Sequence, residues 1–192
     1  MKLLILNGPP DARAAKYSLY RGTYRAHPTY CELLPRDHET NSLFFWFLQE
    51  GGELGVVNDL AKARRYTQLL NQHFSSGPKH FELVEVTDET TSPLTGGQLL
   101  GFDLSAGYNN SLLWWGLEPQ PGLETIPEPI RELVGLVYRC YAPQLNRQGL
   151  FLTPEVASKC LSSMDALQQL CPNLFEGEDI KSQYQVVGVY LV

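Results

Sequence analysis

The amino-acid sequence predicts an α+β fold in which helices pack on a mixed or mainly antiparallel sheet. Helix-start signals occur at Asn58 and Thr153, and each precedes apolar residues at helical spacing. Apolar runs at 81–86 and 184–192 follow these helices and predict strands. The strand-to-strand connection within 81–104 is short and rich in turn residues, which favours antiparallel pairing.

The first half of the chain contains a unit with the order strand, loop, helix, strand. The aromatic-rich run 43–48 has the length of a strand, and a Gly-containing loop and the short apolar stretch 54–57 follow it. Asn58 or Asp59 can cap a helix, whose apolar residues recur at helical spacing: Leu60, Ala63, Tyr66, Thr67 and Leu70. The unit ends with the alternating strand 81–86.

The second half repeats this order about 94 residues later. The run 136–141 predicts a strand, and the short stretch 150–152 precedes a helix that Thr153 caps and Pro154 begins. The last strand, 184–192, is apolar on both sides, as expected of a central strand.

Two interpretations of this order stay open. One is an internal duplication covering about 1–90 and 98–192; the other is coincidence, because the order is common among unrelated proteins. In both cases we expect residues 1–192 to form a single compact domain, since a chain of 192 residues with 43% apolar side chains can bury a substantial core. Two further segments, 87–98 and 117–130, read as loops because turn residues and prolines crowd them.

The charge of the chain is acidic and unevenly distributed. The net charge is −6, with residues 1–80 at +3 and residues 81–192 at −9. An acidic chain is a poor general ligand for phosphate backbones, so a nucleic-acid partner is unfavourable. The apolar run in MKLLILNGPP is too short for a secretory signal, and no run is long enough to span a bilayer, so we expect a cytoplasmic protein without a membrane partner.

The four cysteines lack any Cys-x-x-Cys spacing. They are Cys31, Cys140, Cys160 and Cys171. In a cytoplasmic protein, isolated cysteines usually behave as small buried hydrophobes. We therefore expect all four to be unpaired, with Cys140 and Cys160 buried.

Motifs for chemistry are missing from the sequence. No phosphate-binding, dinucleotide, hydrolase or zinc-protease pattern occurs, so the sequence predicts no cofactor, no metal site and no catalytic residue. One enzymatic alternative remains, in which Cys31 acts as a nucleophile with His27 or His38 as its base. This alternative needs the groups to converge in a cleft between the two halves, and a small-ligand sensor would use the same cleft without chemistry.

Segment 11–30 interleaves arginines and tyrosines, as protein interfaces and stacking surfaces for bases both do. The acidic composition favours the protein interface. The same spacing also suits a helix that buries its tyrosines. The candidate contact residues from this segment are Tyr20, Arg21, Tyr24 and Arg25.

The stretch GYNNSLLWWGLE, 107–118, holds the remaining candidates. Neighbouring side chains of a strand point to opposite faces, so Trp114 and Trp115 cannot both enter one core. We expect one of them, together with Tyr108, to lie at a contact surface. Packing of the tryptophan pair at the edge of a core is the alternative.

These observations favour a small cytoplasmic protein that binds another protein without catalysis, as an inhibitor or immunity-type protein does. The alternatives are the Cys/His enzyme and the small-ligand sensor. The sequence leaves the oligomeric state open.

Overall fold

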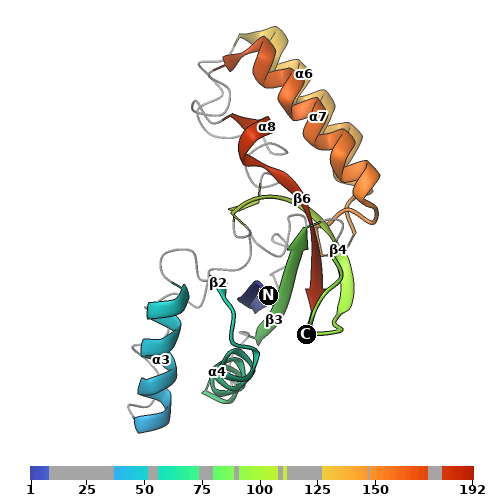
Figure 1. Ribbon diagram of the computed structural model, residues 1–192. Helices are drawn as coiled ribbons and strands as arrows, with labels where there is room; N and C mark the ends of the chain where they lie inside the picture. Colours follow the sequence, from blue (N-terminus) through green and yellow to red (C-terminus); the bar gives the residue numbers. More distant parts are fainter. Residues whose placement is uncertain are drawn as a thin grey trace.

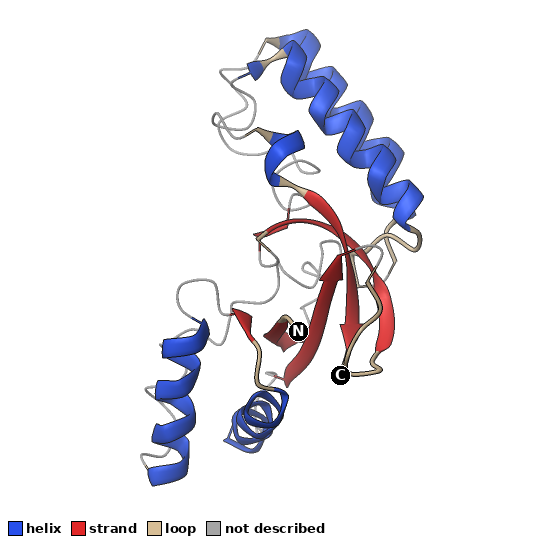
Figure 2. Ribbon diagram, viewed as in Figure 1, coloured by secondary structure: helices blue, strands red, loops and turns tan. Residues whose placement is uncertain are grey.

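The computed structural model places a six-stranded sheet at the centre of the molecule (Figures 1 and 2). It describes residues 1–8, 37–51, 56–73, 80–88, 91–107, 110–111, 127–146, 148–172 and 179–192. The strands are β1 (Leu3–Gly8), β2 (Val56–Val57), β3 (His80–Asp88), β4 (Gln98–Ala106), β5 (Asn110–Ser111) and β6 (Gln185–Leu191). They lie in the order β2-β1-β3-β6-β4-β5, and every pairing between these described strands is antiparallel.

Two helix pairs flank the sheet at opposite ends (Figure 1). The first pair is α3 (His38–Gly51) and α4 (Leu60–His73), and the second is α6 (Glu128–Tyr141) and α7 (Pro154–Leu170). A short 3₁₀ turn, η4 (Ala142–Gln144), follows α6, and the four-residue helix α8 (Ile180–Gln183) precedes β6. Helices packed on an antiparallel sheet confirm the predicted α+β fold.

Both helix pairs cover the same face of the sheet. Leu3 and Phe81 form a core cluster with α3 and α4, and Leu104 and Val186 form another with α6 and α7. Because side chains alternate along a strand, the intervening residues point to the opposite face. A third buried cluster lies there: Leu4, Val84, Val86, Leu150, Val187 and Val189.

The two halves of the sheet have the same connectivity. In the first half β1 lies between β2 and β3, and in the second half β4 lies between Phe151 and β6. Val56 and Val57 point to opposite faces, and Leu150 and Phe151, 94 residues later, repeat this arrangement in the equivalent clusters. The halves meet where β3 pairs with β6. A common origin of the two halves remains a prediction.

The helix starts agree with the sequence prediction. Asp59 accepts a hydrogen bond from the backbone N–H of Lys62 at 3.0 Å, and Thr153 accepts one from Val156 at 3.4 Å. Each side chain satisfies one of the N–H groups that the first turn of a helix leaves without a partner. Both α4 and α7 then bury the face that their sequence spacing indicated, including Ala63 and Ala157.

These two caps offer a paired test of stability. We expect Asp59→Ala and Thr153→Ala each to lower the free energy of unfolding by about 1 kcal/mol, because each leaves an N–H group uncapped. The double variant should lose the sum, since the caps lie in different halves. Urea unfolding measures the change. Asp59→Asn and Thr153→Ser keep a capping oxygen and serve as controls, so an equal loss in them would contradict the capping role.

Two strand predictions are wrong. Residues 43–48 lie inside α3 and residues 136–141 lie inside α6. In both segments apolar side chains also recur at helical spacing, as Phe44 and Phe47 do in α3. Aromatic and β-branched residues favour strands only weakly, and a buried helical face overrides that preference.

The cysteine predictions hold in part. Cys160 is buried and Cys140 is exposed, so the predicted burial of Cys140 is wrong. Cys140 lies on the side of α6 that faces away from the core cluster. Cys140, Cys160 and Cys171 are free thiols, and Cys31 lies outside the described residues. No helix in the described ranges is long and apolar enough to cross a bilayer.

Candidate binding groove on α3 and α4

An open groove of about 380 Å³ lies between α3 and α4. It is lined by His38, Glu39, Ser42, Leu43, Ala61, Lys62 and Arg65. The polar lining consists of the basic side chains of His38, Lys62 and Arg65, the carboxylate of Glu39 and the hydroxyl of Ser42. The groove therefore combines a mixed charge with the apolar side chain of Leu43.

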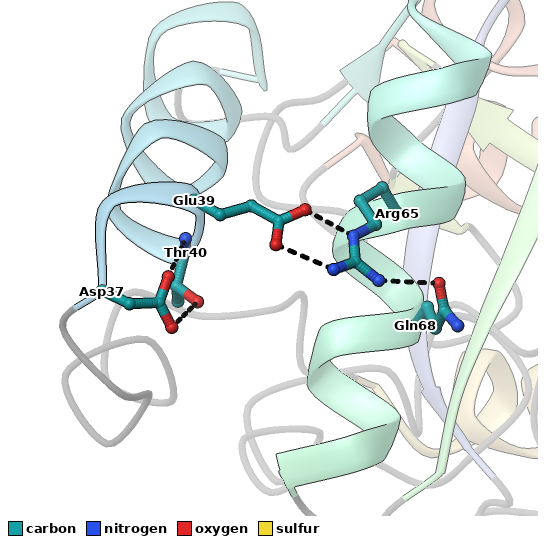
Figure 3. Close-up of polar contacts among 5 residues, drawn as sticks. All are labelled: Asp37, Glu39, Thr40, Arg65 and Gln68. Atoms are coloured by element: carbon teal, nitrogen blue, oxygen red, sulfur yellow. Dashed lines mark hydrogen bonds and ion pairs between the residues drawn. The ribbon is translucent and has the colours of Figure 1, made fainter.

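A capping carboxylate fixes the start of α3 (Figure 3). The Asp37 side chain accepts hydrogen bonds from the Thr40 backbone N–H at 2.8 Å and the Thr40 hydroxyl at 3.0 Å. These bonds favour the ionised carboxylate and lower the pKa of Asp37. The cap sets the first turn of α3 and so places His38 and Glu39 at the mouth of the groove.

A bidentate ion pair between Glu39 and Arg65 joins α3 to α4 across the groove. Arg65 donates to Glu39 through Nε at 2.6 Å and through Nη2 at 2.8 Å, and Arg65 Nη1 donates to Gln68 at 3.0 Å (Figure 3). The hydrogen bond to Arg65 lowers the pKa of Glu39, and the same bond raises the pKa of Arg65. Both groups are solvated, so the pair aligns the helices more than it stabilises the fold.

Aromatic side chains pack beneath and beside the groove. Phe47 contacts Tyr66 of α4 with a ring separation of 5.3 Å, and the Lys62 ammonium lies 5.5 Å from the centre of the Trp46 ring. Trp46 and Phe47 are buried, whereas Phe45, which directly precedes them in α3, is 58% exposed. Phe45 does not line the groove, but a large ring at this exposure on the same helix marks a surface suited to contact with a partner.

One imidazole and one carboxylate are the titratable acid–base groups among the residues that line the groove, beside Lys62 and Arg65. His38 is the single imidazole in the groove, and neither a cysteine nor a second carboxylate lines it. Within the described ranges no cluster of His, Cys, Asp or Glu is arranged to hold a metal ion. In the opposite half, burial and the charge of Asp103 raise the pKa of Cys160 to about 12, so that thiol stays protonated at neutral pH.

The residues predicted from sequence to contact a partner all lie outside the described residues. These are Tyr20, Arg21, Tyr24, Arg25, Tyr108, Trp114 and Trp115. Cys31 and His27 of the enzymatic alternative lie outside them as well, and His38 lies in the groove. The contacts predicted for these residues therefore stay predictions.

Sequence reasoning missed the groove because it assigned 43–48 to a strand. The signal that could have found it is the sequence DHETNSLFFWFL, in which Asp37 is a helix cap and Glu39 lies in the first turn. The pairing of Glu39 with Arg65, 26 residues later, has no local signature. In the comparisons with known proteins, no family model, no curated protein and no solved structure matches this chain.

Proposed function

We propose that the protein acts by binding another protein without catalysis, as an inhibitor or immunity-type protein does. One observation carries the proposal: Phe45 is 58% exposed on the helix that forms one wall of an open groove of mixed charge. Large rings are enriched at protein contacts because they bury much area at small entropic cost.

The groove suits a protein side chain better than an enclosed ligand. Pockets for small ligands bury most of the ligand surface, whereas this groove is open to solvent. Arg65 already has a carboxylate partner, so it is a positioned hydrogen-bond donor instead of a free anion site. A protein surface that supplies an apolar side chain for Leu43, with polar groups around it, fits the groove. Phe45, two residues after Leu43, lies on another side of α3 and offers a separate apolar contact.

The test begins with a change at Phe45. Immobilised wild-type protein and a Phe45→Ser variant are used to capture partners from a lysate of the source cell, and the dissociation constant is then measured with the purified partner. We expect the variant to bind at least ~30-fold more weakly, as for an aromatic residue that contributes about 2 kcal/mol to an interface. The melting temperature should change little because the ring is exposed.

Leu94→Ser is the matched control, because Leu94 is also an exposed apolar residue and lies on the turn between β3 and β4. It should bind the partner with wild-type affinity. Unchanged binding by Phe45→Ser would remove the observation on which the proposal rests. The same assay, applied to Trp114→Ala and Trp115→Ala, tests separately the contact that the sequence predicts.

A further inference from the structure

The helix α6 carries two apolar faces, of which one is used inside the protein. Ile130, Val134, Val137 and Tyr141 contact or belong to the core cluster that α7 shares. They recur at intervals of four, three and four residues, as one face of a helix does. This inner face packs α6 on the core cluster that α7 shares.

The second face is exposed and consists of Pro129, Leu133, Leu136 and Cys140, which we call the outer stripe. Leu133 is 37% exposed and Leu136 is 50% exposed. These residues recur at intervals of four, three and four, so they form a continuous row about 100° around the helix from the inner face. Exposed apolar rows of this kind mark contact surfaces.

The charges that border the outer stripe change sign along the helix. Glu128 and Glu132 lie toward its N-terminus, and Arg139 lies in its last turn. Arg131 pairs with Glu128 at 2.6 Å within the helix. Among the described residues, Glu132 and Arg139 form no ion pair. Glu132 precedes Leu136 in the sequence and Arg139 follows it, and both lie on the same edge of the outer stripe.

We propose that the outer stripe pairs two copies of this chain through antiparallel α6 helices. A twofold arrangement places Leu133 of one copy next to Leu136 of the second copy and places Glu132 opposite Arg139 in both directions. In a parallel arrangement this edge of one helix and the same edge of the other would lie on opposite sides of the pair, so Glu132 and Arg139 would not meet. The stripe is thus complementary to itself in one orientation, which argues for a second copy as its occupant.

This inference is independent of the proposed function. The helices α6 and α7 lie at the end of the sheet opposite α3 and α4 (Figure 1), so pairing through α6 leaves the groove accessible. A single helix pair buries less surface than the roughly 1,200–2,000 Å² of a standard stable interface. We therefore expect a reversible dimer with a dissociation constant of roughly 10 µM to 1 mM.

Sedimentation equilibrium of the full chain over this concentration range tests the proposal. Wild-type protein should convert from monomer to dimer, and Leu136→Arg should stay monomeric throughout. Leu94→Arg changes a leucine outside α6 that is 75% exposed, and this variant should dimerise like the wild type. Circular dichroism checks that both variants are folded. A wild-type protein that is monomeric at every concentration, or a dimer that Leu136→Arg leaves intact, would overturn the proposal.

Charge exchange tests the antiparallel arrangement. Glu132→Arg alone and Arg139→Glu alone each place like charges together, so each should weaken the dimer about fivefold or more at low salt. Mixing the two variants in equal amounts restores both ion pairs in a mixed dimer, and combining both changes in one chain restores them in a homodimer. We expect wild-type association in both cases. Failure of both restorations, with each single variant weakened, would contradict antiparallel pairing.

Discussion

Phe151→Ala is expected to lower the free energy of unfolding by about 3–5 kcal/mol, the range found when a fully buried phenylalanine is truncated. Phe151 is fully buried in the core cluster that the sheet forms with α6 and α7. The centre of its ring lies 6.3 Å from the centre of the Tyr141 ring. For a chain of this length such a loss corresponds to a decrease of about 6–20 °C in melting temperature.

The backbone around Phe151 explains why the site cannot collapse to fill the cavity. Phe151 exchanges two hydrogen bonds with Phe102 of β4, at 2.8 and 2.9 Å. Gly101 has a φ of +152°, and a Cβ there would lie 2.7 Å from the Phe151 carbonyl oxygen. The backbone at position 151 is therefore held against β4, and the cavity left by the missing ring persists.

Leu152→Ala is the neighbouring control, because Leu152 is 68% exposed. Its free energy of unfolding should stay within about 0.5 kcal/mol of the wild type. Urea or thermal unfolding with a fluorescence readout measures both variants. Equal losses at the two positions would show that the assigned burial of this segment is wrong.

The second large effect is expected at Glu85, whose side chain is 1% exposed on β3. Its carboxylate accepts hydrogen bonds from the backbone N–H groups of Leu94 and Thr95 and from the Thr95 hydroxyl, at 2.6–2.9 Å. Glu85→Gln replaces one acceptor oxygen by a donor that faces other donors. We expect a loss of about 2–4 kcal/mol at neutral pH, because hydrogen bonds to a buried charge are among the strongest.

This loss should depend on pH. Burial of Glu85 acts to raise its pKa, but the hydrogen bonds from Thr95 and Leu94 outweigh burial, so the pKa lies below the usual value. A carboxylate with a lowered folded-state pKa stabilises the protein above its unfolded pKa of about 4.3. That contribution disappears as the pH falls through the folded-state pKa.

The difference in stability between wild type and Glu85→Gln should therefore be largest at neutral pH and should shrink below about pH 4. Urea unfolding at a series of pH values measures it. The control is Glu82→Gln on the same strand, where the side chain is half-buried. A difference for Glu85→Gln that stays constant down to pH 3 would contradict the role of the ionised carboxylate.

Much of the fold could be predicted because its signals are local. The caps at Asp59 and Thr153, and the apolar spacing after them, define α4 and α7 within a few residues. The strands at 81–86 and 184–192 follow from alternation and from continuous apolar character, and both lie at the centre of the sheet. These features depend on neighbours in sequence, which is why the sequence contains them.

The errors arise where distant contacts decide the structure. The runs 43–48 and 136–141 have strand propensity, but α3 and α6 form because each buries a face against the helix that follows it. Whether Cys140 enters the core depends on which side of α6 meets α7, and a one-residue rotation of that face changes the answer.

The candidate site could be predicted least. The groove depends on the approach of α3 to α4, and its Glu39–Arg65 pair joins residues 26 positions apart. The sequence indicates Trp114 and Trp115 by their chemical type and by their adjacency, and both lie outside the described residues. Chemical type indicates the capacity for contact, whereas exposure, as at Phe45, depends on the packing of the whole helix.

Hydrogen exchange of the protein with and without its captured partner tests the proposed binding surface most directly. The account predicts slower exchange in α3 and α4, residues 38–51 and 60–73, when the partner is bound. Exchange in α7, residues 154–170, should be unchanged and provides an internal reference. Protection confined to other segments, with α3 and α4 exchanging at their free rates, would contradict the assignment of the α3–α4 surface as the binding site.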